Sequence, residues 1–367
     1  MKIALIIFPI HPSHGCILQT FALQQVLLKD GHEVTIIDRQ WDKPGIFSRC
    51  KDVLKFITGK ISGKQIFLRS KTQDILMSEL MTFVNRNIDN RIVYKSNPQY
   101  SGLKDFDAFI VGSDQTWRPK YVSDVTYYYL EFVPKEANVK RLAYAPSFGT
   151  DEWEYSPKLT AYCKELIQRF DAVSVREESG VKLCNEMYNV EATHVVDPTM
   201  LLEKDDYIKA TNTNFQYDNI ASYYLLDSSQ EKLSIVKAVC DSLGLKPHRV
   251  NTETENSNAP VNLRIAPSIE KWIDGFARSK FIIADSFHAT VFAILFNKPF
   301  ITIANTGRGL SRFESILGKL GLRNRLIFKA DDLTENLITD SVDWELVNSC
   351  LRQERSRSLK FLIENLK

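Results

Sequence analysis

The sequence predicts an α/β protein made of two doubly wound domains that face each other across a cleft. Patterns typical of buried strands alternate with helical patterns in both halves of the chain, as in parallel sheets covered by helices. At 367 residues the chain is also too long for one ordinary hydrophobic core. Asp197-Pro198 ends one run of elements and a new helical pattern starts at Asp205. We therefore expect domains at 1–203 and 204–340, followed by a C-terminal helix at 341–367.

The first domain opens with a strand, a loop, a helix and a second strand. Residues 2–8 form a continuous apolar run, which is typical of a parallel strand covered on both faces. Residues 16–29 show helical spacing that ends at Gly31, and 33–38 is the next strand. Such a unit implies a right-handed crossover. Later segments of this domain are strands at 106–114 and 139–149, a helix at 159–170, a strand in 171–179 that passes into a helix beginning near Glu177, and the run 193–202.

The second half repeats the alternation without repeating the sequence. Its predicted elements are strands at 219–227, 248–252, 281–286 and 299–303, and helices at 229–243, 268–279 and 289–297. Residues 253–260 and 306–317 are predicted as loops, and a long terminal helix covers roughly 341–366.

Composition excludes several classes of protein. A hydrophobic content of 44% and a charged content of 25% are those of a soluble globular protein, and a net charge of +2 does not suggest a nucleic-acid binder. The six cysteines show no zinc or disulfide spacing, which favours a reducing compartment. No run of about 18 apolar residues is present, and MKIALIIF reads as a first buried strand rather than a signal segment. We expect a cytoplasmic protein.

Basic residues cluster in 49–71. This cluster has two interpretations: a solvated helical face, or a face that contacts an anionic membrane surface from the cytoplasmic side.

Polar residues gather where the predicted strands end, which is where open parallel sheets bind ligands. The candidates are His11, Ser13, His14, Gly15, Gly112, Ser113, Asp114, Ser147, Gly149, Arg176, Glu177, Asp285, Ser286 and His288. No G-x-G-x-x-G, Walker-type or G-x-S-x-G motif is present. The two histidines of 11-HPSHG-15 lack a third ligand at metal spacing, so no metal site is predicted.

His288 is the candidate general base. It follows a buried strand and lies beside a helix predicted to start near Ala289. A helix N-terminus disfavours the imidazolium, which keeps the ring neutral and able to accept a proton. Asp285 is expected to cap this helix or to orient His288. In the alternative interpretation, Asp285 and Ser286 cap the helix and His288 only packs.

Arg176 is the candidate anion-binding cation. Its guanidinium follows the strand 171–175 and offers a bidentate fork for phosphate or carboxylate. The alternative is a salt bridge to Glu177, Glu178 or Asp171. The turn 112–114 could expose backbone N–H groups to a ligand or could simply cap a helix.

Six segments together resemble the polysaccharide pyruvyl transferases, in order and spacing, from the first strand to about residue 325. They are 15-GCILQTFALQQVL-27, 111-VGSDQTW-117, 146-PSFG-149, 174-SVREESG-180, 196-VDPTMLL-202 and 284-ADSFHATVFAILFNKPF-300. The resemblance implies a fold similar to the GT-B glycosyltransferases, with the C-terminal helix crossing back to the first domain.

The resemblance also implies a reaction. Members transfer the enolpyruvyl carbons of phosphoenolpyruvate to a sugar as a cyclic ketal and release phosphate, with no separate cofactor. His288 matches the family's catalytic histidine, and Arg176 matches the arginine of its S-x-R-E segment. We expect phosphoenolpyruvate and a sugar acceptor, lipid-linked at the inner membrane face, as partners.

This chain departs from the family at two positions. Several members resemble R-L-H where this chain has Ser286-Phe287-His288, so a second cation is absent there. Arg308 or Arg312 could replace it, or both could be surface residues. His14 stands where many members carry an aromatic or small residue. Two other functions stay open: a glycosyltransferase that uses a nucleotide sugar, and a non-catalytic binding protein.

Overall fold

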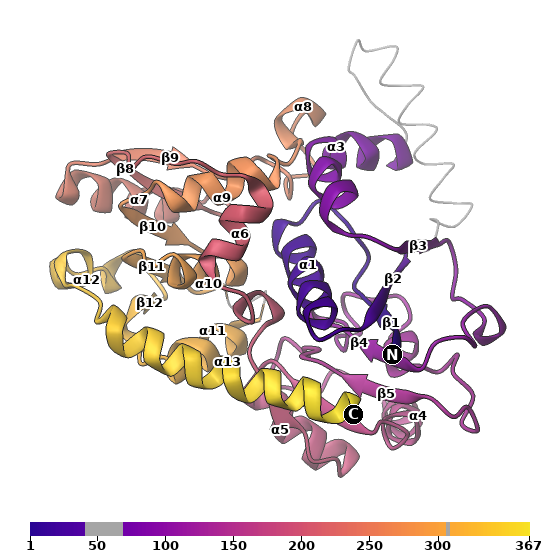
Figure 1. The fold of residues 1–367 in the computed structure, drawn as a ribbon. Helices are drawn as coiled ribbons and strands as arrows, with labels where there is room; N and C mark the ends of the chain where they lie inside the picture. The colour runs from indigo at the N-terminus through magenta and orange to yellow at the C-terminus, as the bar shows by residue number, and fades with distance from the viewer. Residues whose placement is uncertain (41–68, 306–308) are drawn as a thin grey trace.

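The computed structural model describes residues 1–40, 69–305 and 309–367, and in this part of the chain two parallel sheets are covered by helices (Figure 1). The first sheet has seven described strands in the order β3-β2-β1-β4-β5-β6-β7. Its strands are β1 (Lys2–Ile6), β2 (Glu33–Arg39), β3 (Arg91–Tyr94), β4 (Ala108–Val111), β5 (Lys140–Ala143), β6 (Ala172–Val175) and β7 (Thr193–His194). Its helices are α1 (His14–Lys29), α3 (Arg69–Asn87), α4 (Pro157–Ile167) and α5 (Glu178–Leu183).

The second sheet has five described strands in the order β12-β11-β10-β8-β9. They are β8 (Ile220–Tyr224), β9 (Lys246–Arg249), β10 (Phe281–Ala284), β11 (Phe300–Ile303) and β12 (Leu326–Ile327). The accompanying helices are α6 (Lys204–Thr211), α7 (Gln230–Leu243), α8 (Val261–Arg264), α9 (Ile269–Ala277), α10 (Phe287–Leu295), α11 (Leu310–Lys319) and α12 (Glu335–Thr339). The predicted fold class is therefore confirmed.

Strand alternation divides the core into layers. Ile3 and Leu5 of β1 face one buried cluster, whereas Ala4 and Ile6 face another on the opposite side of the sheet. This arrangement explains why the first strand is apolar at successive positions, because both faces of a central parallel strand are covered.

One of these clusters continues from the first domain into the second. It joins residues of β1, α1 and α3 to residues of α9 and α10. Tyr207 bridges the two sides, because its ring lies 6.3 Å from that of Phe21 and 4.8 Å from that of Phe292. The domains are therefore packed through apolar surface, and not only joined by the chain.

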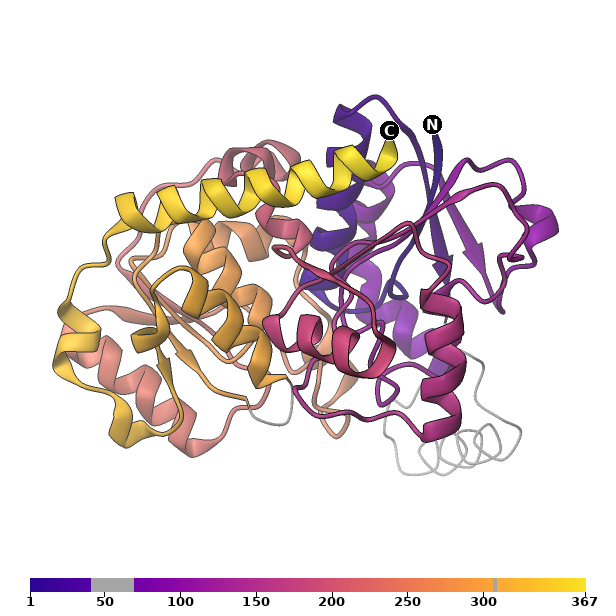
Figure 2. The same cartoon turned by 90° about the horizontal axis from the view of Figure 1, so that it is seen from below.

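The C-terminal helix α13 (Trp344–Leu366) crosses from the second domain back to the first (Figures 1 and 2). Ser358 Oγ accepts a 3.0 Å hydrogen bond from Val196 N. Arg355 donates to the carbonyls of Met200 and Leu202 at 2.8 and 3.1 Å. Near the chain end, Lys140 Nζ donates to Lys367 O at 2.7 Å. The helix thus ties the last part of the chain to the edge of the first sheet.

Several local predictions need correction. The segment 306–317 is not all loop, since α11 begins at Leu310, and α10 begins at Phe287 rather than near Ala289. The elements that were not predicted include α3, β3, α8, β12 and α12. Residues 41–68, which hold most of the basic segment 49–71, and Arg308 lie outside the described residues. The domain boundaries at 203 and 340 stay predictions.

Docking of α13 can be tested by truncating its buried side. Leu362 is completely buried, and Leu346 on the same helix is 59% exposed. We expect Leu362→Ala to lower the free energy of unfolding by about 2–5 kcal/mol through lost burial and a cavity. Leu346→Ala should change it by less than about 0.5 kcal/mol. Urea unfolding of both variants measures the difference, and equal effects would show that α13 is not docked through Leu362.

Candidate active site

Side chains from both domains meet beyond the carboxyl ends of the two sheets. Arg176 follows β6 and Asp197 follows β7 in the first domain, whereas His288 lies in the first turn of α10, after β10 of the second. All three are buried, with Arg176 4%, Asp197 1% and His288 9% exposed. The sequence predicted that Arg176 and His288 would stand at strand ends, and the structure brings them to one carboxylate.

Asp197 holds this group together. Its Oδ2 accepts a 2.6 Å hydrogen bond from Arg176 Nη1 and lies 3.6 Å from His288 Nε2. Its Oδ1 accepts hydrogen bonds from the backbone N–H and the hydroxyl of Thr199, at 3.0 and 2.6 Å. Ser113 Oγ also lies 3.4 Å from Oδ2.

The surroundings keep Asp197 ionised. Burial by itself raises the pKa of the carboxyl, but His288, Arg176 and Thr199 outweigh burial and lower the pKa below its usual range. Burial likewise disfavours the charged form of Arg176, yet Asp197, Asp114 and Glu177 raise the pKa of the guanidinium. The pair is therefore a buried ion pair at neutral pH.

Arg176 has N–H groups that are not used by Asp197. Nη1 is used by Asp197, but Nε and Nη2 are buried without a hydrogen-bond acceptor among the described residues. Asp114 Oδ1 lies 3.7 Å from Nη2, which is too long for a hydrogen bond. Nε and Nη2 form the edge of a guanidinium that binds carboxylate or phosphate with two parallel bonds. A buried edge of this kind is suited to an anionic ligand.

His288 lies directly on the backbone of α1. A Cβ at Gly15 would stand 2.1 Å from His288 Nδ1 and 2.3 Å from Cγ, so only glycine leaves room for the ring. Because Asp197 is ionised, the facing Nε2 is best protonated, and in the neutral ring Nδ1 is then the basic nitrogen. The first domain thus positions a residue of the second.

Asp114 lies beside Arg176 and has an unusual backbone conformation. Its φ of 83° is unusual for a residue with a side chain. Oδ2 accepts a 3.0 Å hydrogen bond from Gln19 Nε2, and Oδ1 accepts one from Gln115 N at 2.8 Å. Although burial raises the pKa of Asp114, Arg176, His288 and Arg312 lower it overall.

Asp285 differs from the prediction. It neither caps α10 nor contacts His288: its Oδ1 accepts from Leu226 N and its Oδ2 from Lys232 Nζ, both at 2.7 Å. The side chain of Ser286, the N-cap residue, makes no capping hydrogen bond either. The alternative in which these two residues serve as caps is therefore also wrong. The carboxylate near His288 is Asp197.

Two other predicted ligand-binding side chains contact protein instead. His14 is 3% exposed, donates from Nε2 to Pro267 O at 2.8 Å, and stacks on Trp272 at 5.3 Å. Ser147 is fully buried and donates to Glu177 Oε1 at 2.9 Å. Both hold the structure around the site. Gly112 also packs against protein, because a Cβ added at this position would stand 3.3 Å from the carbonyl oxygen of Ile6.

Asp197 was not predicted as a member of the site, whereas Glu177 was predicted as one of the polar residues at strand ends. Glu177 Oε1 also accepts from the backbone of Phe148 and Gly149, at 2.8 and 3.0 Å, and so fixes the loop after β5. Asp197 was noted at the predicted domain boundary and in the segment 196-VDPTMLL-202, without a role in the site. Its place directly after the buried residues Val195 and Val196 was the signal that could have identified it.

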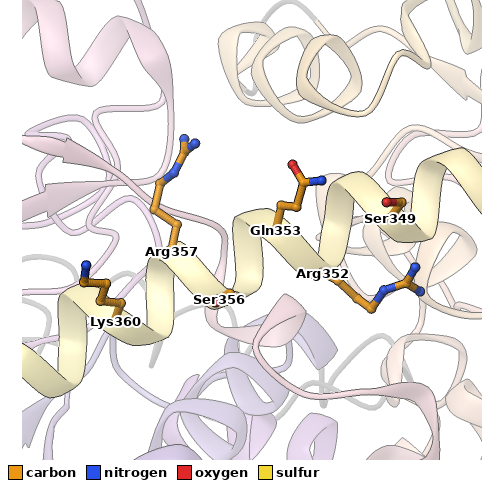
Figure 3. A pocket seen from close by; sticks show the side chains of 6 residues that line it. All are labelled: Ser349, Arg352, Gln353, Ser356, Arg357 and Lys360. Carbon is orange, nitrogen blue, oxygen red and sulfur yellow. The ribbon is translucent and has the colours of Figure 1, made fainter.

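No group of three or more His, Cys, Asp or Glu side chains suited to a metal ion occurs in residues 1–40, 69–305 and 309–367. Within the same ranges, no helix is both long enough and apolar enough to span a membrane. A surface depression of about 510 Å³ lies on α13 (Figure 3). Its lining residues are Ser349, Arg352, Gln353, Ser356, Arg357 and Lys360. They come from one helix and include none of the site residues, so this depression is separate from the site.

The fold and the strand-end site define a two-domain protein similar to GT-B enzymes, and the family follows from sequence. Residues 14–307 match the model of the family described as polysaccharide pyruvyl transferase, and the chain belongs to this family. None of the curated protein sequences matches the chain.

Solved structures support the fold alone. The UDP-GlcNAc 2-epimerase of Methanocaldococcus jannaschii is 11% identical, with a TM-score of 0.52 over 96% of this chain and 92% of that one. The UDP-GlcNAc 2-epimerase of Neisseria meningitidis, bound to UDP-GlcNAc, is 12% identical, with a TM-score of 0.49 over 100% and 99%. At this identity neither similarity indicates what the present chain binds.

The contact between Gly15 and His288 predicts a steric effect. Gly15→Ala should displace the imidazole and lower the free energy of unfolding by about 1–3 kcal/mol, as overpacking does. Gly102→Ala is the control, because a Cβ there meets no atom within 4 Å. Thermal unfolding measures stability, and NMR of the His288 imidazole measures displacement. A stable Gly15→Ala protein with an unmoved His288 signal would contradict the geometry.

The buried imidazole of His14 predicts that the folded protein loses stability at acid pH through the contact between its two domains. Burial lowers the pKa of His14 to about 4, although the hydrogen bond to Pro267 opposes the shift. The unfolded chain therefore takes up the proton first as pH falls below about 6.5. The stabilising contribution of neutral His14 is complete above pH 6.5 and is lost on approach to pH 4. Between pH 7.5 and 5.0 this loss should be about 2 kcal/mol.

Urea unfolding at several pH values measures this loss. His14→Gln should show a shallower decline below pH 6.5 than the wild type, even if it is less stable at pH 7.5. His32→Gln, at the turn between α1 and β2, controls for the removal of an imidazole. Parallel pH profiles for the wild type and His14→Gln would exclude this role.

Proposed function

We propose that this protein transfers the pyruvate unit of phosphoenolpyruvate to a sugar of a surface polysaccharide or its precursor, forming a cyclic ketal and releasing phosphate. The observation that carries the proposal is the Nε–Nη2 edge of Arg176, which has no hydrogen-bond acceptor in the described part of the chain and is buried beside His288 and held by Asp197. Membership of the pyruvyl transferase family supports the same reaction class.

Arg176 binds the donor in this proposal. Phosphoenolpyruvate carries a phosphate and a carboxylate, and either group fits the two parallel donors of a guanidinium edge. The ion pair with Asp197 Oδ2 at 2.6 Å fixes the direction of that edge before the ligand arrives. Preorganisation of this kind lowers the entropic cost of binding.

His288 acts as the general base. Asp197 faces Nε2 and keeps the proton there, so Nδ1 accepts the proton of the attacking sugar hydroxyl. Asp197 is then a positioning residue, because it touches Arg176 and His288 rather than the reacting atoms. The 3.6 Å separation between Asp197 and His288 is long for a hydrogen bond, as is common before substrate binds.

The reaction balances with two hydroxyl groups and no redox partner. Two hydroxyl oxygens form bonds to C2 of the donor, and the bond between C2 and the phosphate oxygen breaks. One hydroxyl proton ends on C3, which becomes a methyl group, and the other leaves with phosphate. The donor is itself a substrate, so the proposal requires no separate cofactor.

We further propose that the acceptor sugar is carried on a lipid at the inner face of a membrane. The basic composition of 49–71 supports a contact with an anionic surface. The donor is a cytoplasmic metabolite, which places the reaction on the same side. A nucleotide sugar as donor remains the competing proposal.

A thermal-shift titration with phosphoenolpyruvate, beside a panel of nucleotide sugars, tests the donor. At about one hundred times its dissociation constant, a ligand stabilises a protein by roughly 2.7 kcal/mol. We expect phosphoenolpyruvate to stabilise the wild type and His288→Gln but not Arg176→Gln. Arg352→Gln, an exposed arginine on α13, is the control and should respond as the wild type does.

Phosphate release from phosphoenolpyruvate, with a panel of methyl glycosides that offer two neighbouring free hydroxyls, tests the base. Loss of a general base typically costs about 10²–10⁴ in rate, so His288→Gln should bind donor and turn over at least a hundredfold more slowly. Stabilisation by nucleotide sugars alone, or full activity in His288→Gln, would overturn the proposal.

A further inference from the structure

Arg176 alone is a poor match for a ligand with two anionic groups. Its positive charge is already shared with Asp197, and Ser286, one residue before Phe287, can donate a hydrogen bond but supplies no charge. A phosphorylated carboxylic acid held by one compensated guanidinium would leave a buried anion without a partner, which is costly. The structure therefore raises the question of where a second cation comes from.

Arg312 lies at the required place. It is in the first turn of α11 and is 7% exposed. Its Cζ lies 5.4 Å from the centre of the Phe287 ring, and the Cζ of Arg176 lies 4.7 Å from the same centre. Two guanidiniums from different domains thus meet at one aromatic ring, next to His288.

The backbone around Arg312 fits its position closely. Gly309, the N-cap residue of α11, has a φ of 98°. A Cβ at Gly309 would stand 2.7 Å from Arg312 Nε and 2.9 Å from the carbonyl oxygen of Gly149. The loop after β5, which Glu177 fixes, therefore abuts the start of α11. Arg312 is directed to the domain junction rather than to the surface, which excludes the predicted alternative of a surface arginine.

Arg312 is buried beside another positive charge. Burial, and then the neighbouring charge of Arg176, lower the pKa of the guanidinium to about 10, although Asp114 and Glu177 oppose the shift. Like charges that are buried side by side repel, and a bound anion relieves that repulsion. The same region holds Nε and Nη2 of Arg176, which are buried and have no acceptor among residues 1–40, 69–305 and 309–367.

We propose that Arg312 is the second cation of an anion site that spans both domains, where Arg176 and Arg312 together bind a ligand with phosphate and carboxylate groups. This inference rests on the proposed function and names the residue that replaces the missing charge at Ser286. Because each domain supplies one guanidinium, the ligand also strengthens the docking of the two domains.

Isothermal titration calorimetry with phosphoenolpyruvate tests the inference on the wild type, Arg312→Gln, Arg312→Lys and Arg352→Gln. We expect Arg312→Gln to weaken binding about tenfold or more, as the loss of a charged hydrogen-bond donor does. Arg312→Lys keeps the charge but loses the planar fork, so its affinity should lie between those of Arg312→Gln and the wild type. Arg352→Gln should bind as the wild type does.

Two further measurements separate ligand binding from a structural role. The dissociation constant should depend less steeply on salt in Arg312→Gln than in the wild type, because one ionic contact is gone. The melting temperature without ligand reports any structural effect independently. If Arg312→Gln does not fold, the comparison of Arg312→Lys with the wild type decides, and equal affinities there overturn the inference.

The outcomes distinguish the inference from the proposed function. Binding of phosphoenolpyruvate by the wild type, with equal affinity in Arg312→Gln, overturns the role of Arg312 and leaves the donor intact. Failure of the wild type to bind phosphoenolpyruvate overturns the proposed donor, and the inference with it. Weaker binding in Arg312→Gln, with a reduced salt dependence, supports both.

Discussion

The site depends on one buried carboxylate that two domains share. Asp197 belongs to the first domain, yet its Oδ2 faces both Arg176 of that domain and His288 of the other. A carboxylate with 1% exposure is tolerable only with such partners, because desolvation otherwise makes ionisation costly. Arg176 and His288 are therefore not independent groups, since moving either one changes the electrostatic balance of the other.

The contacts among Asp197, Arg176 and His288 require the two domains to approach each other closely in one fixed orientation. The His288 ring has room only because Gly15 has no side chain, and the apolar cluster that runs from α1 and α3 into α9 and α10 holds that approach. His14, the neighbour of Gly15, adds a directional hydrogen bond to Pro267. The buried position of Arg176 follows from the same packing, so access to Arg176 and the docking of the domains are linked properties of this fold.

The sequence predicted where the site residues lie in the fold better than it predicted which side chains they contact. Arg176 and His288 were identified because each follows a strand with a strong apolar pattern, and the ends of parallel strands converge. Asp285 was assigned to His288 because they are close in sequence, but at the end of β10 its side chain reaches Lys232 instead. Asp197 lies far from His288 in sequence, and no local pattern records their contact. α11 escaped prediction because Gly309 and the polar residues after it resemble a loop, although apolar residues recur at helical spacing.

In the anion site that we propose, the charge that Ser286 does not supply comes from other segments of the chain. Ser286 is the N-cap residue of α10, and its side chain makes no capping hydrogen bond. Phe287, the next residue, presents a ring to which both Arg176 and Arg312 are attracted. Ser286 and Phe287 carry no positive charge, but two guanidiniums from elsewhere in the chain lie next to Phe287. In the proposed site, the charge that binds the ligand therefore belongs to the whole domain junction, and α11 can supply it as well as the residues before His288.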